Sequence, residues 1–391
     1  MVAGMDKILE KSMDWDVAKN RLQVEQKVIE DHELPLSAWE SAVEGTRFGL
    51  RLKSTGRFYE ATPWAMKKMV GVGSGGREFD YLFEDARHAT SVDKATGEKK
   101  VVFSRDGRDA ALAKATVDLM MFQGDRVDQD KKRLFRTWSD GTLRAILSTR
   151  YQAVNNSWYM NTIQAIFPES KILRWRGNAD TLQFDVHVPG IQAEDDDSGY
   201  GGLLHIGNSE IGQRSIIAQL GVLRFICTNG MIVMDSIAGI RQRHIGDIDL
   251  VDLRKRVVDT ISEGLPNIED EIQKTLGLKA YGVGDVPLSR IFAQLGIDHK
   301  IGKKNLMGVW KSWLTESEIS GPETSQTAFG LQAAITRFGQ TLDNDMAHDF
   351  DVIGGELNRI DRPMWDGFLG RASNMTDKTV KSRVGDVGLG V

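Results

Sequence analysis

A basic stretch with aromatic residues, from Lys131 to Tyr151, contains the side chains best suited to binding a polyanion. Residues 131–178 carry nine Lys and Arg against two acidic residues, although the whole chain has a formal net charge of -5. Guanidinium and ammonium groups bind phosphates through charge-assisted hydrogen bonds, and aromatic rings stack on unpaired bases. The stretch therefore predicts a nucleic-acid-binding surface. The predicted binding residues are Lys131, Lys132, Arg133, Arg136, Trp138, Arg144, Arg150, Tyr151, Arg174 and Arg176.

These residues have distinct expected roles. The five arginines from Arg136 to Arg176 would contact phosphates, the run 131–133 would attract the strand from outside, and Trp138 and Tyr151 would stack on bases. We expect single-stranded DNA as the partner, although nothing in the residue types separates DNA from RNA. Contacts to phosphate would make the binding steeply salt-dependent.

Two alternating patterns predict the strands that would position the arginines. In residues 143–150, Arg144 and Arg150 fall on one strand face, about 20 Å apart. A hairpin is predicted over 170–190 with its turn at 177–180, and its first strand places Arg174 and Arg176 on one face. Its second strand points Leu182, Phe184, Val186 and Val188 inward and Gln183, Asp185 and His187 outward.

The same arginines have an alternative explanation. They could lie on a solvated sheet face and pair with Asp185 and with the acidic loop at 194–197, while Trp138 and Trp175 pack in the core. Surface ion pairs of this kind contribute little to stability. This alternative describes a structural or interaction protein without affinity for nucleic acid.

No catalytic motif competes with the binding prediction. The glycines at 71–76 lack the preceding buried strand of a dinucleotide site, so we expect a loop there. The acidic run 343–351 lacks the glycine and terminal Glu of a calcium loop and suits a helix start. Ser209 is followed by Ile211 where a nucleophile elbow needs glycine, and Cys227 is flanked by apolar residues typical of a core. We therefore predict a protein that is not an enzyme, with neither a metal nor a cofactor.

The elements that must position these residues predict an α+β fold. We expect a central antiparallel β-sheet with flanking helices, followed by a mostly helical C-terminal part, where apolar residues recur every fourth position from Leu253 to Leu265. The apolar run 215–240 should form buried strands and offer surface for assembly. The predicted regions are an N-terminal α+β region at 1–125, a β-rich core with the basic face at 126–250, a helical region at 251–370 and a flexible tail at 371–391.

Composition restricts the class of protein further. The chain has 391 residues, of which 41% are hydrophobic, and a single cysteine, which excludes an internal disulfide and a multi-cysteine zinc site. Its first residues are charged and contain no apolar signal core, and no run of apolar residues is long enough to cross a bilayer. We expect a cytoplasmic protein without a membrane partner.

Three short motifs carry a resemblance to a known family. The positions are Tyr151, Val154 and Asn155, then Asn208, Ser209 and Gly212, then Arg224, Cys227 and Asn229. Over roughly residues 135–235 the chain resembles the phage- and plasmid-borne proteins grouped as domain of unknown function 932. That resemblance implies a mobile-element origin but no established activity.

A fold-level analogy extends this expectation. Many phage annealing proteins also combine an antiparallel sheet with helices and assemble into rings that hold single strands. By this analogy we expect a homo-oligomer, ring or filament, that anneals complementary strands in recombination or replication.

Overall fold

The structure is a computed structural model that describes most of the chain. The described residues are 9–10, 12–25, 28–74, 90–92, 99–101, 107–122, 127–178, 180–194, 199–225, 231–233, 237–342 and 344–385.

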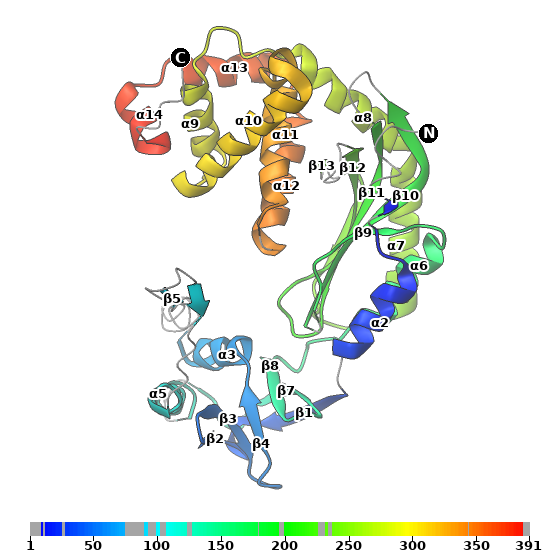
Figure 1. The fold of residues 1–391 in the computed structure, drawn as a ribbon. Coiled ribbons are helices and arrows are strands. Elements are labelled where there is room, and N and C mark those ends of the chain that lie inside the picture. The colour runs from blue at the N-terminus through cyan, green and yellow to red at the C-terminus, as the bar shows by residue number, and fades with distance from the viewer. Residues whose placement is uncertain are drawn as a thin grey trace.

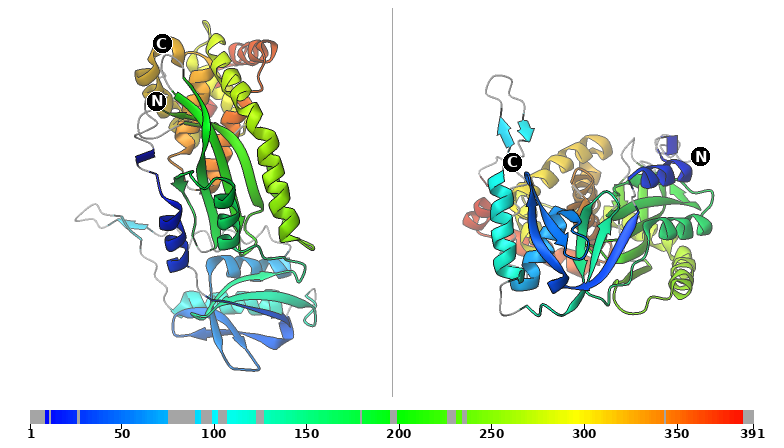
Figure 2. Two further views of the ribbon diagram at one scale, coloured as in Figure 1. Left: turned by 90° about the vertical axis from the view of Figure 1, so that its right-hand side faces the viewer. Right: turned by 90° about the horizontal axis from the view of Figure 1, so that it is seen from below.

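A six-stranded N-terminal sheet forms one end of the molecule (Figures 1 and 2). Its spatial order is β1 (Ile29–Pro35), β7 (Lys132–Trp138), β8 (Thr142–Leu147), β4 (Phe58–Ala61), β3 (Arg47–Leu52) and β2 (Trp39–Glu44). Gly45 and Gly56 have positive φ in the turns on either side of β3, where glycine is the least strained residue. Helices α3 (Pro63–Ser74) and α5 (Gly107–Val117) and the π-helical turn η3 (Asp118–Phe122) pack on this sheet. A short 3-10 turn, η1 (Leu36–Ala38), joins β1 to β2, and β5 (Thr90–Val92) and β6 (Lys99–Val101) form a separate hairpin.

The larger curved sheet is wholly antiparallel. Its strands are β9 (Ile172–Trp175), β10 (Thr181–Glu194), β11 (Gly199–Ser209), β12 (Ile216–Phe225), β13 (Met231–Val233) and β14 (Gly239–Gln242). They follow the order β13-β12-β11-β10-β9, and β14 pairs with β12 next to β13.

Helices cover both faces of the curved sheet (Figure 1). On the convex face lie α2 (Trp15–Glu25), α6 (Asn156–Ile166), α7 (Leu250–Gly264) and α8 (Ile268–Gly277). The 3-10 turns η4 (Leu265–Asn267) and η5 (Leu278–Ala280) precede and follow α8, and η5 also contacts α11. The C-terminal helices are α9 (Leu288–Asp298), α10 (Lys303–Ser325), α11 (Ala328–Gly339), α12 (Asn344–Leu357), α13 (Arg362–Ser373) and α14 (Asp377–Val384). Of these, α11 and α12 contact β13 from the concave side.

The α+β prediction is confirmed, since the curved antiparallel sheet has helices on both faces and is followed by a helical C-terminal part. The predicted region boundaries are not. Strands β7 and β8 pair with β1 and β4 of the N-terminal sheet, so the boundary predicted at 125/126 runs through that sheet. The tail predicted at 371–391 is also wrong for its described part. Helix α14 packs against α9 and buries Val380 and Val384, because apolar residues four apart give this short helix a face to bury.

The hairpin over 170–190 is confirmed, since β9 and β10 pair with Trp175 opposite Phe184. The apolar residues of β10 face the convex side and are buried as predicted. Gln183, Asp185 and His187 were expected to face solvent but are buried as well, because the C-terminal helices cover the concave side. Strand β12 in the apolar run 215–240 is likewise buried within the chain, so it does not provide the exposed assembly surface that we expected.

Within the described residues, no helix combines the length and the apolar character that crossing a bilayer requires.

Candidate nucleic-acid interface

The ten predicted binding residues do not form one surface. Those from Lys131 to Arg144 belong to the N-terminal sheet or its margin, whereas Arg174 and Arg176 lie at β9 of the curved sheet. Three of the five arginines assigned to phosphates are engaged in ion pairs within the chain: Arg136, Arg144 and Arg174.

Arg136 links the two sheets. Its side chain is 3% exposed, and its Nε donates to the Asp31 carboxylate on β1 at 3.1 Å. Its Nη1 donates to the main-chain carbonyl of Glu210, in the turn after β11. A guanidinium held in this way cannot reach an external phosphate, so the role predicted for Arg136 is corrected to a structural one.

Arg144 and Trp138 form a second link between the sheets. The Arg144 guanidinium lies 4.1 Å from the centre of the Trp138 ring, and its Nε donates to Asp180 at 2.8 Å. Asp180 belongs to the β9–β10 turn, and Trp138 is buried under the arginine. Trp138 is therefore not available to stack on a base. Arg144 is neutralised within the chain, but by Asp180 and not by the acids that the alternative explanation names. A hydrogen bond from Trp64 Nε1 to the Ile211 carbonyl, at 3.0 Å, is a third link.

We expect Arg136→Ala to lower the free energy of unfolding by about 2 kcal/mol, because it removes a buried ion pair within the N-terminal sheet and a charge-assisted bond from that sheet to Glu210. Urea denaturation measures this loss. Arg47→Ala, which removes exposed contacts to Glu44 and Glu60, should cost less than about 1 kcal/mol. If Arg136→Ala instead flattened the salt dependence of oligonucleotide binding at unchanged stability, Arg136 would be a phosphate contact.

Arg174 is the centre of a buried charged cluster on the concave face. Its Nε donates to Asp185 Oδ2 at 2.5 Å, and its Nη2 donates to Asp351 Oδ2 of α12 at 3.3 Å. The other oxygen of Asp185 lies 2.7 Å from His205 Nδ1. Arg174, Asp185 and His205 occupy opposing positions of β9, β10 and β11, so their side chains share one row of the sheet. This cluster fixes α12 to the sheet.

The two aspartates of the cluster have opposite pKa shifts. Burial alone would raise the pKa of Asp185, but the Arg174 guanidinium and the His205 hydrogen bond outweigh it and hold that pKa below its usual range. Burial raises the pKa of Asp351 to about 6, against the attraction of Arg174 and together with the repulsion of Asp185. The contacts explain the difference, because Asp185 has partners on both oxygens while Asp351 Oδ1 is buried without one among the described residues.

A pH dependence follows from Asp351. Because the folded protein binds this proton more tightly than the unfolded chain, the raised pKa stabilises the fold at pH 4, and this contribution is lost as pH rises through 6. An asparagine side chain resembles the protonated acid. We therefore expect the free energy of unfolding of Asp351→Asn, relative to that of the wild type, to increase by about 1–3 kcal/mol between pH 4 and pH 7.5. Chemical denaturation across that range measures the gain, and a constant difference between the two proteins would contradict it.

The remaining predicted cations differ in exposure. Lys131 and Lys132 are exposed at the start of β7, whereas Arg133 and Arg176 are half-buried. Burial and the neighbouring Arg174 lower the pKa of Arg176. None of these four side chains lines the cleft described next.

Arg150 lies outside the strand in which it was predicted. Strand β8 ends at Leu147, and Arg150 follows in an exposed turn, so it does not share a strand face with Arg144. Its carbonyl accepts a hydrogen bond from the Gly246 amide at 3.0 Å, which places it beside the loop after β14. Tyr151 comes next and lines a cleft of about 980 Å³.

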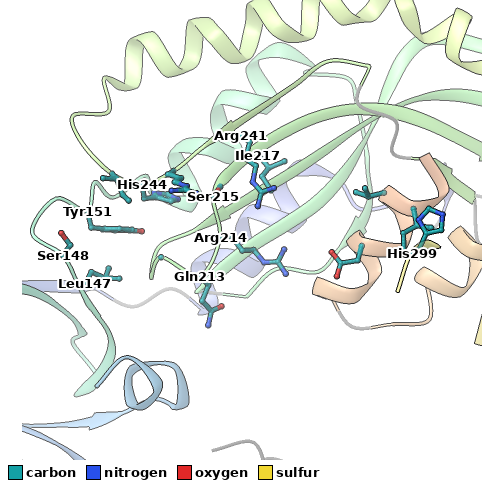
Figure 3. Close-up of a pocket in the computed structure, with 16 residues that line it drawn as sticks. Leu147, Ser148, Tyr151, Gln213, Arg214, Ser215, Ile217, Arg241, His244 and His299 are labelled. Carbon is teal, nitrogen blue, oxygen red and sulfur yellow. The ribbon is translucent and has the colours of Figure 1, made fainter. Parts of the chain in front are cut away.

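The cleft lies where the N-terminal sheet, the edge of the curved sheet and the C-terminal helices meet (Figure 3). It is lined by Leu147, Ser148, Tyr151, Gly212, Gln213, Arg214, Ser215, Ile217, Arg241, Arg243, His244, Ile245, His299, Asp349, Val352 and Ile353. Of the predicted binding residues, only Tyr151 is in this lining.

Aromatic stacking and main-chain pairing build one wall of the cleft. The rings of Tyr151 and His244 stack with centroids 5.2 Å apart and planes 21° apart. The Tyr151 hydroxyl donates to the Ser209 carbonyl at 2.8 Å, and His244 Nδ1 lies 3.0 Å from the Gln152 carbonyl. Burial is the largest cause of both pKa shifts, raising that of Tyr151 and lowering that of His244, so both rings are uncharged at neutral pH.

The motif residues meet at this wall. Gly212 has φ +70°, and a Cβ there would lie 2.9 Å from Leu147 Cδ2 and 3.4 Å from the Tyr151 ring. Asn208 Nδ2 donates to the Val154 carbonyl at 2.8 Å. Residues of the first two motifs of the resemblance therefore contact one another directly beneath the cleft. In the third motif, Arg224 is buried against Glu316, while Cys227 and Asn229 lie outside the described residues.

The sequence reading missed the cations of the cleft. Arg241 and Arg243 are exposed on and just after β14, and among the described residues no acid pairs with them or with Arg150. Arg214 is half-buried, and burial lowers its pKa while nearby Asp349 opposes that shift. The segment "RQRH" at 241–244 is a short basic signal in the sequence, but it lies ninety residues beyond the end of the basic stretch 131–151.

Other predictions fall partly outside the described residues. Gly71 and Gly73 belong to helix α3 and not to a loop, whereas Gly76 is not among the described residues. Asp195 to Asp197 of the acidic loop are not described either. The described residues hold no group of three or more His, Cys, Asp or Glu side chains arranged to bind a metal.

Comparison of the chain with protein-family models, curated proteins and solved structures finds no match. The family resemblance therefore stays a prediction.

Proposed function

We propose that this protein binds single-stranded nucleic acid, preferably DNA, in the cleft beside β14. The observation that carries the proposal is the pair of exposed guanidiniums in the lining, Arg241 and Arg243, with exposed Arg150 next in the chain to the lining residue Tyr151. Among the described residues, no acid pairs with any of these three arginines. Unpaired cations at the rim of a cleft are suited to phosphates, since binding releases counterions without first breaking an internal ion pair.

The shape of the site favours a single strand. The volume of about 980 Å³ is at the upper end of the range for ligand clefts, which suits a short segment of one strand. Half-buried Tyr151 adds an aromatic ring to the lining, supported from behind by the buried ring of His244. Aromatic groups in a basic groove are typical of proteins that hold unpaired bases.

The biological role extends this proposal. We propose a cytoplasmic protein of a phage or plasmid that anneals complementary strands in recombination or replication, without enzymatic activity. Annealing would require several protomers to align their clefts, so the proposal includes a homo-oligomer, ring or filament.

A second candidate is a structural or interaction protein of a mobile element without nucleic-acid affinity. The internal neutralisation of Arg136, Arg144 and Arg174 favours it, because these ion pairs are used within the fold. The Arg144–Asp180 pair joins the two sheets, and the Arg174–Asp351 pair joins the curved sheet to α12. The two candidates differ in whether the cations of the cleft bind nucleic acid.

Fluorescence anisotropy with a labelled single-stranded oligonucleotide distinguishes them. The proposal predicts binding at 50 mM salt that weakens steeply by 200 mM and that exceeds the binding of the matched duplex. The same titration with RNA tests the preference for DNA. Absence of binding at low salt would leave the structural role as the better account.

A further inference from the structure

We propose that Asp349 makes the cleft selective for guanine. This inference rests on the proposed function, because it concerns how the same cleft treats the bases of a bound strand. Asp349 lies on the exposed side of α12 and is the one carboxylate among the described residues that line the cleft. The same lining contributes the guanidiniums of Arg214, Arg241 and Arg243, which come from other segments than α12.

A carboxylate in this position is unfavourable for phosphate. Two negative groups within a few ångströms repel each other, and a partly enclosed cleft screens that repulsion less than open solvent does. The phosphates of a bound strand should therefore lie along the exposed guanidiniums of Arg241, Arg243 and Arg150, away from α12. The part of the nucleotide that reaches Asp349 is then the base.

The chemistry of the bases decides which one fits. An ionised carboxylate only accepts hydrogen bonds, and it accepts two at once from a pair of adjacent donors. Guanine presents such a pair, N1–H and the N2 amino group. Cytosine and adenine present one amino group beside an acceptor nitrogen, and thymine presents N3–H between two carbonyl oxygens that the carboxylate would repel.

Arg214 strengthens the preference. It lines the same cleft, and its guanidinium is close enough to Asp349 for the two charges to interact. Guanine carries its acceptor O6 next to N1–H, so a guanidinium beside the carboxylate can donate to O6 while the carboxylate accepts from N1 and N2. The other three bases do not offer this order of donors and acceptor.

The test uses five thymidine 12-mers that differ only at one central position, which is guanine, hypoxanthine, adenine, cytosine or thymine. Hypoxanthine is guanine without the N2 amino group. We expect the guanine oligonucleotide to bind about tenfold more tightly than the all-thymine one, with hypoxanthine between them, as for a good bidentate contact. Asp349→Asn should reduce the five affinities to within about twofold of one another. Asp270→Asn changes charge equally at an exposed site on α8 and should keep the preference.

The outcomes separate this inference from the function on which it rests. Tight, salt-sensitive binding of all five oligonucleotides with equal affinity would overturn the guanine preference and leave the proposed function intact. Equal tightening of all five by Asp349→Asn would show that the carboxylate only repels the strand, which also overturns it. If none of the five binds at low salt, the proposed function fails and the inference fails with it.

Discussion

Replacing Arg241 and Arg243 together with glutamine should weaken the binding of a single-stranded oligonucleotide about 10- to 100-fold at 50 mM salt. Each guanidinium that contacts a phosphate forms a hydrogen bond between charged groups, and losing two such bonds from an exposed site accounts for a change of this size. Both side chains line the cleft and are exposed, so the substitution leaves no buried group without a partner. Stability should therefore change by less than about 0.5 kcal/mol.

The salt dependence gives a second readout for the same variant. The slope of log affinity against log salt should become shallower by about 1.4, the value for two phosphate contacts on a single strand. Arg254→Gln with Lys255→Gln is the matched control, because it removes the same charge from exposed positions on α7. If the control lowered affinity and slope as much as the cleft variant, binding would depend on net charge alone and the cleft would not be the site.

Glu316→Leu should lower the free energy of unfolding by about 3–5 kcal/mol. Glu316 of α10 and Arg224 of β12 are both fully buried, with Arg224 Nη1 2.7 Å from Glu316 Oε1. Arg337 of α11 approaches the other oxygen at 3.0 Å, and the Arg224 guanidinium lies 4.5 Å from the centre of the Phe329 ring. Removing the carboxylate leaves the buried Arg224 guanidinium without its counter-ion, and this accounts for the large cost.

Thermal or urea unfolding measures this loss, and two further variants test its cause. Glu318→Leu changes an exposed carboxylate two positions along the same helix and should cost less than about 0.5 kcal/mol. Arg224→Leu combined with Glu316→Leu should be more stable than Glu316→Leu alone, because the fully buried guanidinium is removed with its counter-ion, while the loss of the Arg337 contact is common to both variants. If the double variant were less stable than Glu316→Leu, the loss of stability would come from lost packing and not from the buried guanidinium that has lost its counter-ion.

The predictable part of the fold is the part that local patterns encode. Alternation over 170–190 predicts the β9–β10 hairpin because both strands and their turn are contiguous. Nothing local indicates that β1 pairs with β7, which follows it by about a hundred residues and brings Asp31 opposite Arg136. Strands that pair over such a distance are therefore assigned, from the sequence, to different regions of the chain.

The arginines show the same limit for the site. The alternation of residues in a strand does not show whether an arginine is buried and paired with a carboxylate far away in the sequence, or exposed and able to bind phosphate. Arg136 is 105 residues from Asp31, and Arg144 is 36 from Asp180. Tyr151, predicted to stack on a base, lines the cleft, but its neighbours there, His244 and Arg241, come from β14 and the loop after it. Only the folded chain brings those segments together.

The position of the cleft at a three-way junction has a thermodynamic consequence. Leu147 comes from the N-terminal sheet, Arg241 from the edge of the curved sheet and Val352 from α12, so any molecule in the cleft touches all three parts at once. By mass action, a ligand that needs this junction to be assembled raises the free energy of unfolding by about 2.7 kcal/mol at a concentration of 100 times Kd. The same thermodynamic linkage means that a substitution that weakens the junction also weakens binding of the ligand. A change at Arg136, which bonds to both sheets, should therefore lower affinity for a ligand although Arg136 does not line the cleft.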